Sequence, residues 1–253
     1  MGKNAEITVS AILEGKNLTK SFGGLTAVQG VDFRLEQGEI VGLIGPNGAG
    51  KTTLFNLISG VFPSDTGTLR FNGREIGELR SFEICRLGIA RTFQIVRPFL
   101  KMNCLENVLV GIAGREVKEA RKKEEKRDEA RELLKFIGLP GEENRLAQNL
   151  TLIQKKRLEM ARALATRPRV ILLDEVLAGL NPSEMRQALE LIEVIRSERK
   201  ITIFWIEHVM GAIMKGSDRV IVLDQGKKIR EGKPEEVVTD PRVIEAYLGE
   251  ADA

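Results

Sequence analysis

The sequence contains few cysteines, no long hydrophobic run and no excess of charge of one sign. Its 253 residues include two cysteines, Cys85 and Cys104, without a metal-ligand spacing, so we expect reduced thiols in a cytosolic protein. No apolar run approaches the roughly 20 residues that a membrane-spanning helix needs. Residues 1–15 lack the apolar core of a secretion signal. These absences argue against a secreted or membrane-spanning protein.

Charge is plentiful but balanced, which argues against nucleic-acid binding. The formal net charge is +3, and charged residues make up 30% of a chain that is 42% hydrophobic, the composition of a soluble globular protein. The densest charged run, residues 115–132, alternates in sign, whereas an arm that binds a phosphate backbone would carry one sign. We expect this run to form a solvated helix with ion pairs four residues apart.

A glycine-rich turn lies between a predicted strand, residues 40–44, and a predicted helix. Gly45, Gly50, Lys51 and Thr52 satisfy the phosphate-loop pattern G-x-x-x-x-G-K-[ST]. Glycines allow backbone N–H groups to curl around phosphate oxygens, and the following helix directs the positive end of its dipole at the same anion. Lys51 would reach the β- and γ-phosphates, and the Thr52 hydroxyl would bind Mg²⁺. The strand before the turn and the helix after it favour this interpretation over a glycine turn without a ligand.

The order of the predicted elements indicates an α/β fold with an inserted helical segment. From about residue 10 to about residue 82, short runs of alternating polarity separated by glycine turns predict antiparallel strands around the phosphate-loop strand. Helical periodicity dominates from about 83 to 166, and from about 167 strands alternate with a helix, as in a parallel core sheet. We expect one domain over residues 1–253. The predicted elements after the phosphate loop cover residues 106–112, 117–137, 154–165, 170–173, 183–197, 201–206, 219–223 and 228–231.

An apolar strand, residues 170–173, is followed by two carboxylates, Asp174 and Glu175. At the end of a core strand beside the phosphate loop, Asp174 is placed to hold Mg²⁺, directly or through water. Glu175 is then placed to orient or deprotonate the attacking water. The alternative is a strand that happens to end in acidic surface residues, and the phosphate loop upstream favours the catalytic interpretation.

Two further polar residues follow predicted strands. His208, the only histidine, comes after the apolar residues 201–206, and Gln94 comes after a short apolar strand. Ligands gather at the strand ends of open α/β sheets, so we expect His208 to contact the γ-phosphate or water. The amide oxygen of Gln94 would bind Mg²⁺ or water. Each residue alone is also compatible with a packing or surface role.

Together, in this order, these elements resemble the ATP-binding subunit of an ABC transporter, from Leu18 to about Leu248. The segments GIARTFQIVRPFLKMNCLENVLVG, DEVLAGLNPSE and IEHVM are similar to those of the ATPases of branched-chain amino-acid uptake systems. The resemblance implies a P-loop, RecA-like core with a mostly parallel sheet, an antiparallel β-subdomain and an inserted α-helical subdomain. It implies ATP and Mg²⁺ as cofactors, with ATP held between two subunits whose closure drives a permease.

The resemblance also assigns roles to individual residues. The expected catalytic residues are Glu175, His208 and Gln94. The expected magnesium ligands are Thr52, Gln94 and Asp174. The expected nucleotide-binding residues are Phe22, Val28, Gly45, Pro46, Asn47, Gly48, Ala49, Gly50, Lys51, Thr52 and Thr53. Phe22 would stack on adenine, unless it is a core phenylalanine between strands. Residues 178–181 resemble the D-loop, which crosses the dimer interface, and residues 95–100 would lie near the permease's coupling helix.

One segment departs from the family pattern. The signature loop, close to LSGGQ in the family, reads LTLIQ, so that Leu152 and Ile153 replace both glycines. Thr151 keeps a hydroxyl and Gln154 matches. In the family this loop holds the γ-phosphate bound to the opposite subunit, and β-branched Ile153 tolerates φ > 0 poorly. We therefore predict an asymmetric dimer, in which a different partner subunit completes the ATP held by Lys51. The alternative is that Thr151 and the helix dipole suffice.

The sequence thus predicts a cytosolic ATPase subunit, peripheral on the inner face of the cell membrane, that energises import of branched-chain or other amino acids. Its expected partners are a second ATP-binding subunit in a head-to-tail dimer, permease subunits and, indirectly, a solute-binding protein. A lipid or lipopolysaccharide exporter is an alternative, because the transported solute never contacts this subunit. A P-loop kinase would need an acceptor site that the sequence does not show. A soluble ABC ATPase acting on ribosomes or DNA would usually carry two fused cassettes.

Overall fold

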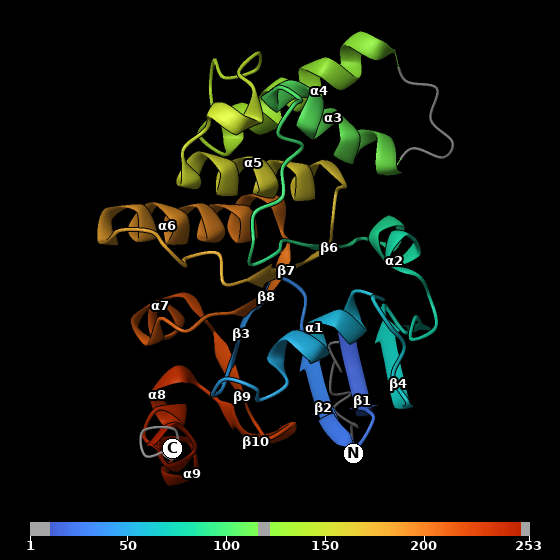
Figure 1. Ribbon diagram of the computed structural model, residues 1–253, viewed down its shortest axis with the longest axis vertical. Coiled ribbons are helices and arrows are strands. Elements are labelled where there is room, and N and C mark those ends of the chain that lie inside the picture. Colours follow the sequence, from blue (N-terminus) through green and yellow to red (C-terminus); the bar gives the residue numbers. More distant parts are fainter. Residues whose placement is uncertain (1–10, 116–121, 249–253) are drawn as a thin grey trace, which may run out of the picture.

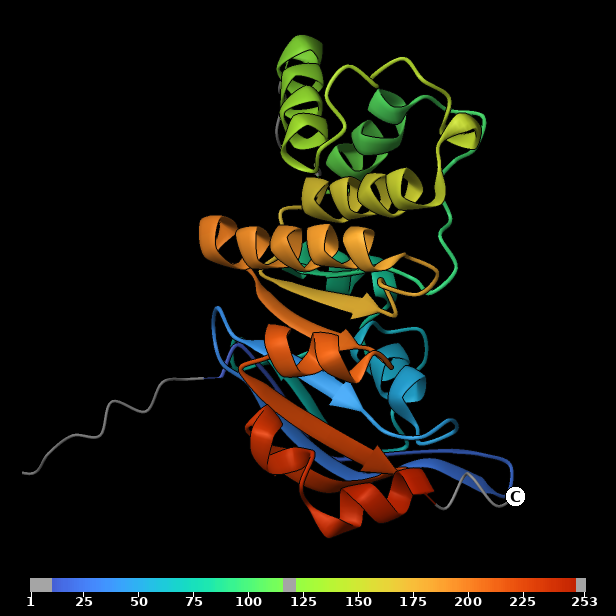
Figure 2. The ribbon, with the colours of Figure 1, turned by 90° about the vertical axis from the view of Figure 1, so that its left-hand side faces the viewer.

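A six-stranded sheet forms the centre of the computed structural model, which describes residues 11–115 and 122–248 (Figure 1). The strand order is β10-β9-β3-β8-β7-β6, and neighbours are parallel except for β9 and β10. Figure 2 shows the arrows of the central strands pointing to one side of the molecule, where α1 also lies. The strands are β3 Ile40–Ile44, β6 Ile89–Arg91, β7 Val170–Asp174, β8 Thr202–Ile206, β9 Arg219–Asp224 and β10 Lys227–Gly232.

A second sheet, with strand order β2-β1-β4-β5, is antiparallel throughout, as the alternating polarity of its residues predicts. Its inward side chains share one apolar core with α1 and with one face of the central sheet. Phe204 of β8 lies at their junction, with its ring centroid 5.6 Å from that of Phe33 and 5.2 Å from that of Phe55. The strands are β1 Leu13–Phe22, β2 Leu25–Leu35, β4 Thr66–Phe71 and β5 Arg74–Glu75.

Helices cover the other face of the central sheet and extend beyond it. Three of them pack together at the top of Figure 1, and their apolar side chains form a second core with α6 and the sheet. These three are α3 Cys104–Arg115, α4 Lys123–Phe136 and α5 Leu152–Ala165. The other helices are α1 Lys51–Ile58, α2 Ser81–Leu87, α6 Pro182–Arg199, α7 Met210–Gly216, α8 Pro234–Val237, α9 Pro241–Leu248 and the 3-10 helix η1 Ala147–Asn149. No helix in the described ranges has the length and hydropathy of a membrane span.

The α/β architecture predicted from the sequence is confirmed, with one difference in the order of the strands. β6 is the short apolar strand predicted before Gln94, and it pairs with β7 in the central sheet. β8 lies between β3 and β7, so the strand that ends at Asp174 is not the neighbour of the phosphate-loop strand. Pairing order depends on crossover connections, which the periodicity of a single strand does not encode.

The charged run also differs in detail from its prediction. The helix predicted over residues 117–137 corresponds to α4, which begins at Lys123. Residues 116–121 lie outside the described part of the chain, as do residues 1–10. The ion pairs on α4 include Arg131–Asp128, three rather than four residues apart, at 2.6 Å. Both spacings put the two charges on the same helix face, so the solvated helix forms as expected.

Candidate functional site

The phosphate loop runs from β3 into α1, and two of its glycines are required by close packing. Gly45 has φ 148°, and a Cβ there would lie 2.0 Å from the Leu223 carbonyl oxygen. Gly50 has φ 98°, and its Cβ would lie 2.3 Å from the Ala27 carbonyl oxygen. No other residue fits either position. α1 then begins at Lys51 without a side-chain cap, so its N-terminus can face an anion.

Lys51 is the buried cation of this loop. Its side chain is 6% exposed, and its ammonium donates to the carbonyl oxygens of Gly45 at 2.6 Å and Pro46 at 2.8 Å. A buried ammonium requires such acceptors. Asn47, Gly48 and Thr52 are exposed around it. The loop therefore combines a cation, a helix N-terminus and exposed backbone, and these are the groups that bind phosphate.

Glu175, His208 and Gln94 form one hydrogen-bonded group, although they are far apart in sequence. The Gln94 amide donates to Glu175 Oε2 at 2.7 Å, and His208 Nε2 lies 2.8 Å from Glu175 Oε1. Glu175 is the first residue beyond β7 and has a left-handed backbone, with φ 49°. Its N–H donates to the Ile206 carbonyl at 2.9 Å, which ties the turn to β8. Backbone strain of this kind in a non-glycine residue is concentrated at functional sites.

Asp174 is buried and paired with Arg91, a residue that the motif analysis missed. Arg91 Nη2 donates to Asp174 Oδ2 at 2.8 Å, and the two side chains are 6% and 4% exposed. Arg91 Nη1 donates to Asn56 Oδ1 at 2.6 Å and Ser59 Oγ at 3.0 Å on α1. Arg91 therefore connects the acidic strand end to the phosphate-loop helix. The signal that could have revealed it is an arginine inside the short apolar strand IAR.

The residues around Asp174 fit a magnesium ion. Asp174 Oδ1 is buried and has no hydrogen-bond partner, which is costly unless a cation or water completes it. Among the described residues no cluster of three or more His, Cys, Asp or Glu side chains is arranged to hold a metal. Mg²⁺ commonly uses one or two carboxylates together with waters and phosphate oxygens, so a site that depends on the nucleotide agrees with both observations.

Two residues expected to bind the nucleotide, Phe22 and Val28, differ in their exposure. Phe22, at the end of β1, is 48% exposed and contacts Phe62 edge-on with ring centroids 5.2 Å apart, so the alternative of a core phenylalanine is wrong. Val28, also expected among the nucleotide-binding residues, is buried in the shared core. β2 directs the Val28 side chain inward, where it supports the sheet.

The signature-like segment forms an ordinary helix start. The Thr151 hydroxyl accepts from Gln154 N–H at 3.4 Å, and the Gln154 side chain accepts from Thr151 N–H at 3.0 Å. This capping box opens α5 at Leu152, and neither Leu152 nor Ile153 has positive φ. The helical conformation therefore accommodates Ile153 without a left-handed backbone. Compared with the family's glycines, Leu152 and Ile153 add side-chain bulk, since Leu152 is 47% exposed at the N-terminus of the helix.

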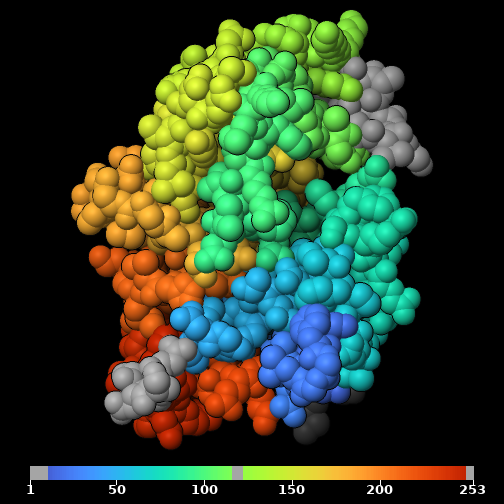
Figure 3. Space-filling model, in the orientation of Figure 1, coloured from blue at the N-terminus to red at the C-terminus, as the bar shows by residue number. Residues whose placement is uncertain are grey.

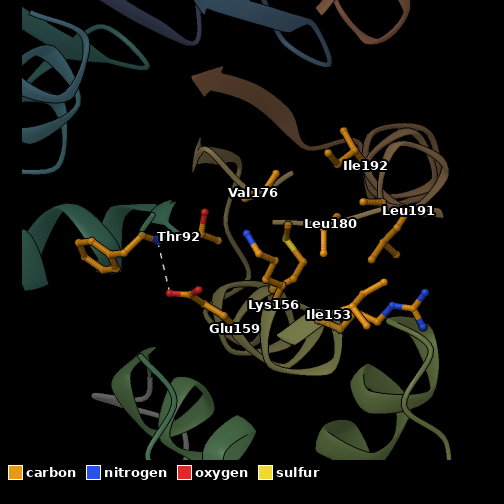
Figure 4. Close-up of a pocket in the computed structure, with 12 residues that line it drawn as sticks. Thr92, Ile153, Lys156, Glu159, Val176, Leu180, Leu191 and Ile192 are labelled. Carbon is orange, nitrogen blue, oxygen red and sulfur yellow. Dashed lines mark hydrogen bonds between the residues drawn. The ribbon is translucent and has the colours of Figure 1, made fainter. Parts of the chain in front are cut away.

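A largely apolar pocket between α5, α6 and the segment after Glu175 contains ionisable groups that the motifs do not explain (Figure 4). Lys156 donates to the Glu175 carbonyl oxygen at 3.4 Å, and Glu159 accepts from Phe93 N–H at 3.3 Å. Nearby, buried Glu207 accepts from Leu177 N–H at 2.8 Å. Burial raises the pKa of Glu159 and of Glu207 to about 7, and burial lowers the pKa of Lys156. These contacts tie α5 to the strand ends.

Two family models match the chain. The model described as ABC transporter matches residues 28–178, and the model described as branched-chain amino acid ATP-binding cassette transporter matches residues 227–253. The chain is 43% identical over 251 residues to the high-affinity branched-chain amino acid transport ATP-binding protein BraF of Pseudomonas aeruginosa, covering 95% of this chain and 98% of that protein. It is 42% identical over 251 residues to LivG of Escherichia coli, with the same coverage.

Solved structures agree with these sequence matches. The crystal structure of the ADP conformation of an ATP-binding cassette of an ABC transporter matches with a TM-score of 0.86 and 34% identity, covering 95% of this chain and 99% of that one. A dimeric structure of a cassette in a post-hydrolysis state, bound to ADP and Pi, matches with a TM-score of 0.79 and 27% identity, covering 88% of this chain and 98% of that one.

Proposed function

The chain belongs to the family of ABC transporter ATP-binding subunits, and from this membership we propose that it hydrolyses ATP to drive import of branched-chain amino acids through a membrane permease. The observation that carries the catalytic part is the position of the Glu175 carboxylate between Gln94 and His208. All three residues follow parallel strands that end at the same edge of the sheet as the phosphate-loop strand.

Some of the described residues bind the nucleotide and others transfer the proton during hydrolysis. The phosphate loop and Lys51 bind the phosphates, and exposed Phe22 offers a ring on which adenine can stack. Thr52, Gln94 and Asp174 would hold Mg²⁺, which supplies neutralisation of phosphate charge when bound. Gln94 and His208 orient the Glu175 carboxylate, which takes a proton from the attacking water.

The exposed apolar residues after β6 support contact with a permease. Phe93, Ile95, Phe99 and Leu100 are between 44% and 68% exposed, in a segment that has little regular structure. In Figure 3 this green segment lies on the outer surface and spans from the core to the helices. Exposed apolar side chains gathered in one segment are typical of an interaction surface. Contact there would place the protein on the inner face of the membrane.

We infer that the partner in the head-to-tail dimer is a different ATP-binding chain. In a homodimer, Leu152 would project from α5 toward the nucleotide of the other copy, where the family pattern has glycine. A variant with Leu152→Gly and Ile153→Gly should therefore raise the ATPase rate of this chain alone. In the mixed dimer, the signature of the partner chain completes the site in which Lys51 binds ATP. The two glycines should therefore have little effect on hydrolysis at that site. Equal rates for parent and variant alone would contradict the inference.

The catalytic proposal is tested with Glu175→Gln. We expect this variant to bind ATP with parental affinity and to lose hydrolysis by at least about 100-fold, because an amide cannot take the proton. Glu198→Gln, on the exposed face of α6, is the matched control and should retain full activity. Phosphate release without any acceptor molecule separates an ATPase from a kinase.

The transport proposal needs the complete system. Permease and partner subunits reconstituted with this chain in vesicles should accumulate labelled leucine, isoleucine or valine in an ATP-dependent manner. Glu175→Gln should abolish accumulation, and Glu198→Gln should not. Surviving hydrolysis in Glu175→Gln would contradict the role of Glu175, and ATP-driven uptake of lipid instead of amino acids would contradict the substrate class.

A further inference from the structure

The only tyrosine of the chain, Tyr247, contacts the phosphate loop from the C-terminal helix. The Gly45 N–H donates to the Tyr247 hydroxyl with a nitrogen–oxygen distance of 2.9 Å, and the contact is partly buried. The two residues are 202 positions apart in sequence. No phosphate-loop pattern includes this tyrosine, and α9 is not among the elements that the sequence analysis predicts.

Tyr247 and Lys51 hold the two peptide groups that flank the Cα of Gly45. The carbonyl of Gly45 accepts from the Lys51 ammonium at 2.6 Å, while its N–H is occupied by Tyr247. A side chain at Gly45 would meet the Leu223 carbonyl of β9, so only glycine fits between β9 and these two partners. Rotation of Gly45 would break both hydrogen bonds, so the tyrosine acts on the position of the Lys51 ammonium through one glycine.

α9 is anchored firmly enough to serve as a support. Val243 is 3% exposed and belongs to the core that the helices share with the central sheet. At the start of the helix, Asp240 accepts from Arg242 at 2.9 Å and lies 3.3 Å from Arg230 of β10. Hydrogen bonds from Arg242 and the nearby guanidinium groups hold the pKa of Asp240 at about 2, well below its usual range. The start of α9 is thereby joined to the sheet that carries the phosphate loop.

We propose that Tyr247 is a positioning residue for nucleotide binding, which orients the Gly45 peptide and through it the Lys51 ammonium. The proposal rests on the proposed ATPase function, since it concerns the same phosphate loop. The C-terminal helix thus belongs to the nucleotide site, although it does not contribute to the phosphate-loop motif. Tyr247 contacts the loop that binds the phosphates, whereas the Glu175 group lies after the ends of β6, β7 and β8, so we expect the tyrosine to act on binding rather than on the chemical step.

The test compares Tyr247→Phe with the parent full-length chain, because phenylalanine keeps the ring and removes only the hydroxyl. One neutral hydrogen bond corresponds to a change of about twofold to tenfold in an equilibrium constant. We expect the dissociation constants for ATP and ADP, measured with a fluorescent nucleotide, to rise by this factor. KM for ATP should rise with them, while kcat stays at the parental value. Thr239→Val removes a hydroxyl that bonds only within the C-terminal segment, and it should change none of these quantities.

Hydrogen exchange separates positioning from a purely structural role. In Tyr247→Phe the backbone amides of residues 42–48 should exchange faster, while the unfolding midpoint stays close to that of the parent. Tyr247→Phe with unchanged nucleotide affinity and unchanged exchange would overturn the proposal. If the parent itself binds no ATP, and Lys51→Ala changes nothing, the proposed function fails instead. Parental binding that Lys51→Ala abolishes and Tyr247→Phe leaves intact would refute only the role of the tyrosine.

Discussion

Replacing Arg91 with leucine should destabilise the protein more than any exchange of a surface arginine. The Arg91–Asp174 pair is almost fully buried, so loss of the guanidinium leaves a carboxylate without a partner in the core. Removing one member of a buried ion pair typically costs about 3–5 kcal/mol. The variant also loses the hydrogen bonds of Arg91 to Asn56 and Ser59. For a chain of this length that free energy corresponds to a decrease of about 10 °C in the unfolding midpoint.

The assay is urea unfolding of Arg91→Leu beside Arg131→Leu, followed by the fluorescence of Trp205, the only tryptophan. Arg131 pairs with Glu124 and Asp128 on the exposed side of α4, so its loss should cost no more than about 1 kcal/mol.

Adding Asp174→Asn to Arg91→Leu removes the unpaired charge, and we expect the double variant to regain part of the lost stability. The reasoning is refuted if Arg91→Leu is as stable as Arg131→Leu. It is also refuted if Asp174→Asn makes the Arg91→Leu variant less stable instead of more stable.

Two further predictions concern the buried residues Glu207 and Gly45. Burial raises the pKa of Glu207 from 4.5 to about 7, so between these values the native state holds a proton that the unfolded state releases, and stability falls as pH rises. Glu207→Gln keeps an oxygen for Leu177 N–H, and urea unfolding should show it gaining up to about 3 kcal/mol on the parent between pH 4 and pH 8. Gly45→Ala should abolish nucleotide binding because its Cβ clashes with the Leu223 carbonyl, whereas Gly114→Ala, in α3 with open space around it, should bind ATP normally.

The features that the sequence predicted correctly depend on short stretches of chain. A phosphate loop needs only a buried strand, glycines at fixed offsets and a helix, all within about 15 residues. The ends of β7 and β8 were predictable for a similar reason, since apolar runs of strand length stop at Asp174 and Glu207. Parallel strands bring such ends to one edge, so the meeting of Glu175 with His208 follows from topology.

Two features of the site depend on local conformation that neither a simple alternation of residues nor the family pattern encodes. β1 and β2 pair with register shifts between Gly15 and Ser21, so counting alternate residues does not tell which side chains of β2 face inward. Val28 is one that does. At the signature-like segment, the capping box of Thr151 and Gln154 is compatible with a helical Ile153, because residues in a first helical turn need no positive φ.

The residues that the sequence did not reveal share a physical property: each acts through a partner that is remote in the chain. Arg91 and Asp174 are separated by 83 positions, and Gly45 and Tyr247 by 202. Periodicity and motif spacing report only on neighbours, while these contacts depend on which strands pair and on where the last helix docks. Both contacts support a residue of a motif: Arg91 neutralises the Asp174 carboxylate, and Tyr247 fixes the backbone of Gly45. The motifs therefore specify which groups meet the nucleotide, and the remote partners specify how firmly those groups are held.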